Sequence, residues 1–380
     1  MLPLSPMADA PAPQAIDPAV ELLPDVPVSR AEEDLLARGP LALRLCELAC
    51  AQPAATPRVV GLAGGPGAGK SSVLNLATAL LADRGDLAFL TVDGTGHAGA
   101  REVIDALIRQ LLEFFAAQDV VDTTDAVRDS LARYGGVISG LARIAGVKVD
   151  LGGAIARSAD DVRAEIAEMT QEIGQRIVIF LDHVDRLPGR EMAGLLVALR
   201  HVAAIPYVAI VLAYDRRAAA LLPDEILDPR SFERLVPVEI GLPPADRVLL
   251  ARVLAGGLAR IAKRTGRDVD DVLHLCDPDE PEGSPLLDLC ETPRDAKRAV
   301  NALAAALPLV ASGASAADVA DVALDIVLRV QVPALDSPRL DQRRRVQGTA
   351  RAMLLAELDA VVAGHPLAGP ARAALRWLFH

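Results

Sequence analysis

The stretch GLAGGPGAGKSS at residues 61–72 constrains the fold more than any other part of the chain. It places five glycines and one proline within nine residues, between the apolar run RVV and the helix-like run VLNLATALL. Glycines let a backbone curl so that successive N–H groups converge, and a helix that begins there directs the positive end of its dipole at the same point. The stretch therefore predicts a strand, a tight loop and a helix built around an anion.

The spacing within this loop is typical of nucleotide phosphates. Gly64, four intervening residues, Gly69, Lys70 and Ser71 fit the pattern G-x-x-x-x-G-K-[ST]. Lys70 is expected to reach the β- and γ-phosphates, and the Ser71 hydroxyl to bind Mg²⁺. The alternative is a glycine-rich turn with an incidental lysine. The residues expected to hold the nucleotide here are Gly64, Gly65, Pro66, Gly67, Ala68, Gly69, Lys70, Ser71 and Ser72.

Five short apolar runs predict a buried parallel sheet. None of them alternates between apolar and polar residues, so both faces of each strand are expected to be covered by helices. The fold class is therefore α/β, a doubly wound parallel five-stranded sheet followed by a C-terminal helical, lid-like domain. The expected strands are RVVGLA at 58–63, LAFLTV at 87–92, RIVIFLD at 176–182, YVAIVLAY at 207–214 and LVPVEI at 235–240.

Composition shifts suggest four segments. A flexible leader rich in Pro and Ala is expected over 1–27, the α/β domain over 28–243, the helical lid domain over 244–330 and a helical tail over 331–380. Near the start of the α/β domain, SRAEEDLLARGPLALRLCELACAQ is expected to form a helix capped by Ser29, with Glu32 completing a capping box.

Charge and composition restrict the class of protein. The net charge of −12 argues against a chain whose main role is to grip nucleic acid. The longest apolar candidate, at 134–156, is interrupted by Arg143, Lys148 and Asp150, whereas a membrane span needs about 20 clean residues. The four cysteines show no zinc spacing and are expected to be reduced thiols. A cytoplasmic protein without an integral membrane segment is expected.

Further candidate residues follow the third and fourth strands. Asp182 ends an apolar strand, where a carboxylate can bind Mg²⁺ and a buried charge without a cation would be costly. His183 and Asp185 are alternative groups for orienting the attacking water; Asp185 could instead cap a helix or pair with Arg186. Tyr214 and Asp215 end the fourth strand, where Asp215 is expected either to approach the γ-phosphate or to cap the next helix.

Taken in order, these motifs resemble the KAP family of P-loop NTPases, within the AAA+/STAND-like branch of that fold. The resemblance is carried by GLAGGPGAGKSS, FLDHVDR, AYD, SFERLVPVEI and ETPRDAKRAVNAL, and covers about residues 25–305. It implies ATP and Mg²⁺ as cofactors. It also implies that Arg234, with Arg230 as a second candidate, lies near the γ-phosphate, often from a neighbouring subunit, and that Arg294 in the lid senses that phosphate. The alternative for each arginine is a solvated helix residue.

The chain departs from the family pattern in ways that bear on activity. Family members commonly carry two adjacent Asp residues where this chain has Asp182 and His183, which puts the rate of hydrolysis in question. Many carry transmembrane helices between the two magnesium motifs, whereas this chain has only helices interrupted by polar residues from about 101 to 172.

The resulting hypothesis is an ATPase, and the His183 departure leaves slow hydrolysis open. It would act as a nucleotide-driven conformational switch or assembly factor for a protein partner or a homo-oligomer, and the resemblance implies a role in bacterial defence against phage. One alternative is a nucleotide-binding scaffold with little or no hydrolysis. Another is a small-molecule kinase, although residues 93–175 show no acceptor-base signature. A GTPase lacks support because there is no N-K-x-D motif.

Overall fold

The structure is a computed structural model. It describes residues 22–53, 55–56, 58–117, 164, 167–168, 170–266, 268–280, 283–309, 315–335, 340 and 347–379. Most of the expected leader and the whole of the apolar candidate at 134–156 lie outside the described residues. The described chain divides into two compact units: an α/β unit, Val26–Leu249, and a helical unit formed by 22–25 and 250–379. The domain boundaries expected from the sequence stay predictions.

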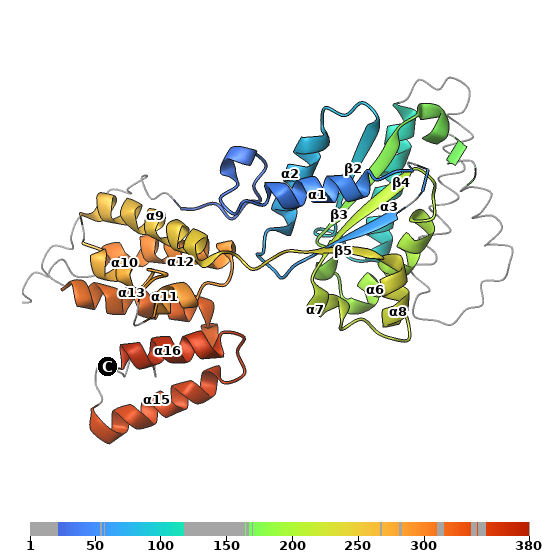
Figure 1. The fold of residues 1–380 in the computed structure, drawn as a ribbon. Helices are drawn as coiled ribbons and strands as arrows, with labels where there is room; N and C mark the ends of the chain where they lie inside the picture. Colours follow the sequence, from blue (N-terminus) through green and yellow to red (C-terminus); the bar gives the residue numbers. More distant parts are fainter. Residues whose placement is uncertain are drawn as a thin grey trace, which may run out of the picture. The chain divides into compact units, whose positions relative to one another are not determined.

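The α/β unit contains one five-stranded sheet in which every strand pairs in parallel (Figure 1). Its order is β2-β3-β4-β1-β5, so β4 lies between the strand that precedes the glycine-rich loop and the strand that ends in Asp182. This confirms the doubly wound fold expected from the sequence. The strands are β1 (Arg58–Ala63), β2 (Leu87–Asp93), β3 (Arg176–Asp182), β4 (Val208–Tyr214) and β5 (Val238–Gly241).

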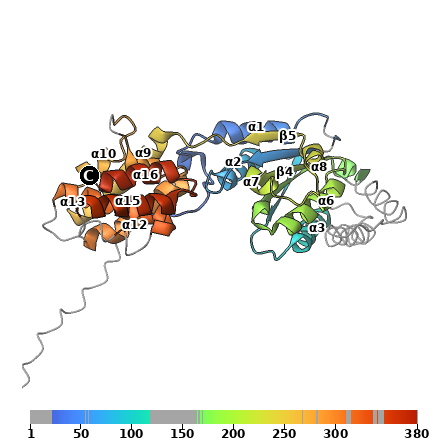
Figure 2. The same cartoon turned by 90° about the horizontal axis from the view of Figure 1, so that it is seen from below.

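Helices cover both faces of the sheet, which explains the unbroken apolar runs (Figure 2). Phe180 and Val211 face the core shared with α1 (Gly39–Ala49) and α2 (Lys70–Leu81). Ile179 and Ile210 face the opposite core. That core holds α3 (Ala100–Ala116), α6 (Gly189–Val202) and α8 (Pro229–Leu235); the shorter pieces are η1 (Ala31–Glu33), η2 (Val184–Arg186) and α7 (Arg216–Ala219).

Two local predictions were wrong in extent. The helix expected from Ser29 onward is interrupted: η1 is followed by Ala37 at φ 50° and then by α1, which has Pro40 in its first turn. A proline without an N–H fits a first turn but not a helix interior. The run LVPVEI is only partly strand, because α8 extends through Leu235 and the Val236 N–H still donates to the Phe232 carbonyl.

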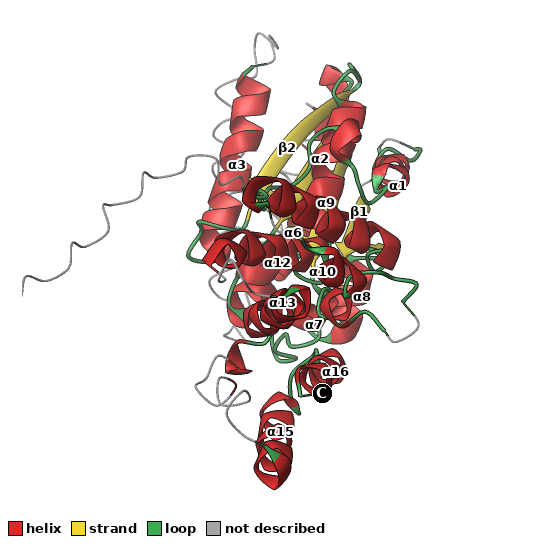
Figure 3. Cartoon of the chain, turned by 90° about the vertical axis from the view of Figure 1, so that its left-hand side faces the viewer, coloured by secondary structure: helices red, strands yellow, loops and turns green. Residues whose placement is uncertain are grey.

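The helical unit is built from α-helices and short 3₁₀ turns, and every described strand belongs to the α/β unit (Figure 3). Gly257 permits close packing, since a Cβ there would lie 2.4 Å from a Val300 methyl carbon. Among the described helices, none is both long and apolar enough to cross a bilayer. The helices are α9 (Arg247–Thr265), α10 (Asp270–His274), α11 (Pro285–Asp288), α12 (Pro293–Ala306), α13 (Ala316–Gln331), α15 (Gly348–Val362) and α16 (Ala368–Leu378), with turns η3 (Leu307–Leu309) and η4 (Pro333–Leu335).

Candidate functional site

The glycine-rich loop connects β1 to α2, as the sequence predicts. Gly67 and Gly69 lie in the left-handed region, at φ 76° and 99°, which favours glycine. Helix α2 has no side-chain cap at Gly69, whereas α12 and α13 both begin with a complete capping box. The first N–H groups of α2 therefore face no capping side chain and are available to an anion.

The loop borders open space at Gly65 and Gly69, whereas Gly64, where the loop leaves β1, is closely packed. A Cβ at Gly65 or Gly69 would meet no atom within 4 Å, but one at Gly64 would lie 2.8 Å from Leu242 Cδ1. The Gly64 N–H also donates to the Tyr214 carbonyl of β4 at 3.0 Å. The loop is thus anchored where it leaves the sheet and open where phosphates would enter. Pro66 and Ala68 lie in the turns between these glycines.

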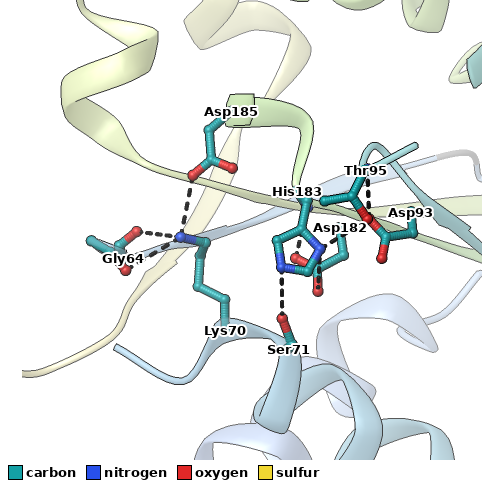
Figure 4. Close-up of polar contacts among 9 residues, drawn as sticks. Gly64, Lys70, Ser71, Asp93, Thr95, Asp182, His183 and Asp185 are labelled. Carbon is teal, nitrogen blue, oxygen red and sulfur yellow. Dashed lines mark hydrogen bonds and ion pairs between the residues drawn. The ribbon is translucent and has the colours of Figure 1, made fainter. Parts of the chain in front are cut away.

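Lys70 is buried among oxygen atoms (Figure 4). Only 8% of it is exposed. Its ammonium donates to the Gly64 carbonyl at 2.8 Å and to the Gly65 carbonyl at 3.3 Å, and lies 3.3 Å from Asp185 Oδ2. Phosphate oxygens are acceptors of the same kind for a cationic donor.

Asp182 and Ser71 supply oxygen atoms that fit Mg²⁺. Asp182 is 7% exposed, and its Oδ1 accepts from the His183 N–H at 2.8 Å. Within the described residues, no cluster of three His, Cys, Asp or Glu could hold a metal ion. Mg²⁺ is usually held by one or two protein oxygens together with phosphates and water, so a carboxylate and a hydroxyl suit it.

The His183 ring lies between Ser71 on one side and Asp93, at the end of β2, on the other. Its Nε2 lies 3.4 Å from Ser71 Oγ, and its Nδ1 lies 3.0 Å from Asp93 Oδ1 and 3.6 Å from Asp182 Oδ2. The His183 backbone is left-handed, at φ 54°. Asp93 was missed by the sequence reasoning; the signal that could have found it is an acidic residue followed by glycine at a strand end.

Asp215 and Tyr214 lie at the end of β4. Asp215 caps α7, where its Oδ1 accepts from the Arg217 N–H at 2.9 Å, so its approach to a γ-phosphate stays a prediction. Tyr214 is buried and donates its hydroxyl proton to Glu239, which also accepts from Arg216. Burial, followed by the contact with Glu239, raises the pKa of Tyr214.

The remaining candidate residues make no hydrogen bond or ion pair with the Lys70, Asp182 and His183 side chains in the described part of the chain. Ser72 Oγ accepts from the Val28 N–H at 3.1 Å. Arg230 and Arg234 are exposed on α8, and within the described residues neither side chain has a hydrogen-bond acceptor. Arg294 belongs to α12 of the helical unit, where its Nε donates to Asp25 at 2.7 Å. The roles of these residues stay predictions.

Arg38 was also missed by the sequence reasoning. It precedes α1 and is only 5% exposed, and it donates to the Pro243 carbonyl at 2.9 Å and to the Ala68 carbonyl of the loop at 3.5 Å. Burial lowers the pKa of its guanidinium, although Asp34 acts in the opposite direction. No pattern in the sequence marks Arg38, because the two carbonyls it meets come from distant segments.

Comparison with known proteins gives a family match that includes the glycine-rich loop. A model of the KAP family P-loop domain matches residues 38–310. A search of curated proteins returned no match.

Several solved structures are similar to this chain at low sequence identity. The Aeropyrum pernix ORC2 protein, in ADPNP–ADP complexes, is 14% identical over 90% of this chain and 94% of that chain, with a TM-score of 0.40. Cdc6p from Pyrobaculum aerophilum is 14% identical over 96% and 98%, with a TM-score of 0.42. The Aeropyrum pernix ORC1 protein, in complex with DNA, is 16% identical over 86% and 83%, with a TM-score of 0.34. These likenesses are too weak to carry an argument about function.

Proposed function

The chain belongs to the KAP family of P-loop NTPases, and from that premise we propose that it binds ATP with Mg²⁺ and hydrolyses it. The observation that carries the proposal is the position of Lys70. A buried ammonium is held by carbonyl and carboxylate oxygens, beside a loop whose glycines leave open space. Burial of a cation is costly unless it is paired, so an arrangement that offers exchangeable partners suits a site that receives phosphates.

Each loop residue has a proposed role in binding. The backbone from Gly64 to Ser71 surrounds the phosphates, and Lys70 exchanges its carbonyl and Asp185 contacts for β- and γ-phosphate oxygens. Ser71 and Asp182 would hold Mg²⁺, which when bound offsets negative charge on the phosphate oxygens.

The reaction itself is the addition of water to the γ-phosphate. The water oxygen bonds to the γ-phosphorus as the bond to the β–γ bridging oxygen breaks, giving ADP and inorganic phosphate and releasing one proton to solvent. His183 and Asp185 are the alternative groups that orient the water. Asp185, which forms an ion pair with Lys70 in this structure, becomes free for this role once Lys70 turns to the phosphates.

The nucleotide state is proposed to control the helical unit. Arg294 would sense the γ-phosphate after leaving Asp25, and Arg234 or Arg230 would approach it from a second copy of the chain. Asp215 would contact the γ-phosphate or its water. The switch would act on a protein partner or a homo-oligomer, in bacterial defence as the family suggests, in a cytoplasm that keeps the four free cysteines reduced. The case against nucleic acid as a partner rests on net charge alone.

A second candidate is a nucleotide-binding scaffold with little turnover. The position of His183 favours it, because this ring contacts Ser71 and Asp93 where the family commonly has a second Asp. Both candidate functions require the same nucleotide-binding site, and they differ only in whether the bound ATP is hydrolysed.

Phosphate release with ATP and with GTP tests the proposal. We expect release with ATP that is lost in Lys70→Ala and in Asp182→Ala. Turnover of GTP but not ATP would overturn the choice of nucleotide, and binding without release would favour the scaffold. The size of the protein in solution is measured alongside, with a non-hydrolysable ATP analogue. A size that the analogue leaves unchanged would overturn the proposal that Arg234 acts from a second copy of the chain.

A further inference from the structure

Three side chains form a continuous line from β2 to the phosphate loop. Asp93 Oδ1 lies 3.0 Å from His183 Nδ1, and His183 Nε2 lies 3.4 Å from Ser71 Oγ (Figure 4). The residues come from three elements: the end of β2, the residue after β3 and the first turn of α2. The imidazole is therefore held at both nitrogens, between a carboxylate and the proposed Mg²⁺ ligand.

The backbone fixes this line. Asp93 and Asp182 are register partners in the parallel pair β2–β3, and the Gly94 N–H donates to the Asp182 carbonyl at 2.8 Å. A Cβ at Gly94 would lie 2.7 Å from the His183 carbonyl oxygen, so the two strand ends approach closely only because residue 94 is glycine. The left-handed conformation of His183 is uncommon for a non-glycine residue, and its N–H donates to Oδ1 of the neighbouring Asp182.

The direction of each hydrogen bond follows from chemistry. Burial acts to raise the pKa of Asp93, but hydrogen bonds from the Thr95 N–H and hydroxyl and the contact with His183 outweigh it, so the pKa is lowered. An ionised carboxylate only accepts, so Nδ1 of His183 carries a proton. The other ring nitrogen, Nε2, faces the Ser71 hydroxyl, which can donate to it while keeping its own oxygen lone pairs free.

We propose that Asp93 is a positioning residue that acts through His183 to hold the Ser71 hydroxyl with its oxygen lone pairs free for Mg²⁺. The inference rests on the proposed function, since it gives Ser71 the role of a metal ligand. In many metal sites a carboxylate orients a histidine that itself binds the metal. Here the histidine orients a hydroxyl ligand instead of binding the metal itself.

This arrangement also bears on the choice of water-orienting group. Both ring nitrogens of His183 are engaged, by Asp93 and by Ser71, so the ring has no lone pair to offer to a water molecule. Asp185 keeps carboxylate oxygens that become available when Lys70 turns away. Asp185 is therefore the group that orients water.

Two measurements on the full chain test the inference. The first is the nitrogen NMR spectrum of the histidine rings, with His183 assigned by its loss in His183→Gln. We expect Nδ1 protonated and Nε2 unprotonated in the wild type, and a loss of this preference in Asp93→Ala. A ring protonated at Nε2 in the wild type, or one unchanged in Asp93→Ala, would overturn the inference.

The second measurement is the Mg²⁺ concentration needed for half-maximal binding of a fluorescent, non-hydrolysable ATP analogue. We expect Asp93→Ala, His183→Gln and the double variant to raise it by the same factor, about tenfold. In Asp93→Ala, binding of the analogue without Mg²⁺ stays unchanged, whereas a general loss of structure would weaken it too. The matched control is Asp86→Ala, a half-exposed aspartate before the start of β2 that pairs with Arg84.

The possible failures are distinguishable. If the wild type binds no nucleotide, the proposed function fails and this inference falls with it. If the wild type binds but Asp93→Ala keeps its Mg²⁺ requirement, only this inference fails. Losses that add in the double variant would show that Asp93 does not act through His183.

Discussion

The Lys70 ammonium and the Asp185 carboxylate lie 3.3 Å apart, and both side chains are largely buried. Asp185 thus takes one of the contacts of Lys70 that a phosphate oxygen would take in the proposed site. In the proposed mechanism binding breaks this pair, and the free energy needed to break it reduces the affinity for nucleotide.

Asp185→Asn should therefore bind a non-hydrolysable ATP analogue more tightly, by about tenfold or ~1.4 kcal/mol. The same variant should release phosphate more slowly, because it loses the group that orients water. Calorimetry and phosphate release measure the two effects. Asp83→Asn, an exposed carboxylate in the turn after α2, is the matched control for the change of charge. Weaker binding by Asp185→Asn would contradict the exchange of partners.

The glycines of the site give a second prediction, because they serve different purposes. Gly65→Ala meets no atom within 4 Å, so the free energy of unfolding should change by less than about 0.5 kcal/mol. Its methyl group would still obstruct the approach of phosphate, and nucleotide affinity should fall at least about tenfold. Gly94→Ala places its Cβ 2.7 Å from the His183 carbonyl oxygen and should cost about 1–3 kcal/mol of stability.

Urea unfolding and nucleotide titration together separate these variants. Gly85→Ala, in an open turn before β2, is the control for both. A Gly65→Ala protein with wild-type affinity would show that phosphates do not approach this part of the loop.

Arg38 gives a third prediction. Arg38→Ala should lower the free energy of unfolding by about 2 kcal/mol, since it removes buried packing and hydrogen bonds to two carbonyls. Arg38→Met keeps most of the packing volume and should cost less. Both variants lose the contact with Ala68 in the loop, so nucleotide affinity should fall to the same extent in each. If Arg38→Met keeps the wild-type affinity for nucleotide, Arg38 does not support the phosphate loop.

The sequence predicted the elements that depend on local pattern. The limits of β1 and β3 were found to the residue, because Val, Ile and Leu concentrate where helices cover both faces. The loop and its lysine were found because glycine spacing is itself a local constraint. The interruption before α1 was missed, although Gly39 and Pro40 are visible in the sequence, because the spacing of leucines continued across it.

The parts of the site that the sequence did not predict depend on the order of strands. Asp93 meets His183 because β2 and β3 are register neighbours, and Tyr214 meets Glu239 although residues of β1 separate their strands in the sheet. A single sequence carries no record of which strand ends become adjacent. Polar residues at strand ends can be recognised, but their partners cannot.

The cluster of Tyr214, Arg216 and Glu239 gives a prediction about pH. Burial acts to raise the pKa of Glu239, but the hydrogen bonds from Arg216 and Tyr214 prevail and lower it. A carboxyl whose folded pKa lies below its unfolded value stabilises the fold above the unfolded pKa, and this contribution is lost as pH falls through the folded value. The difference in unfolding free energy between wild type and Glu239→Gln should be full at neutral pH and shrink below about pH 4.3. Urea midpoints across that range measure it, and a difference that does not change with pH would contradict the prediction.

The measurement that tests the central claim most directly is calorimetric titration of ATP into the full chain at millimolar Mg²⁺. The account predicts saturable heat from one site in the wild type and none in Lys70→Ala, with both proteins equally folded by urea unfolding. The absence of heat with any nucleoside triphosphate would contradict the account, and so would equal heat in Lys70→Ala.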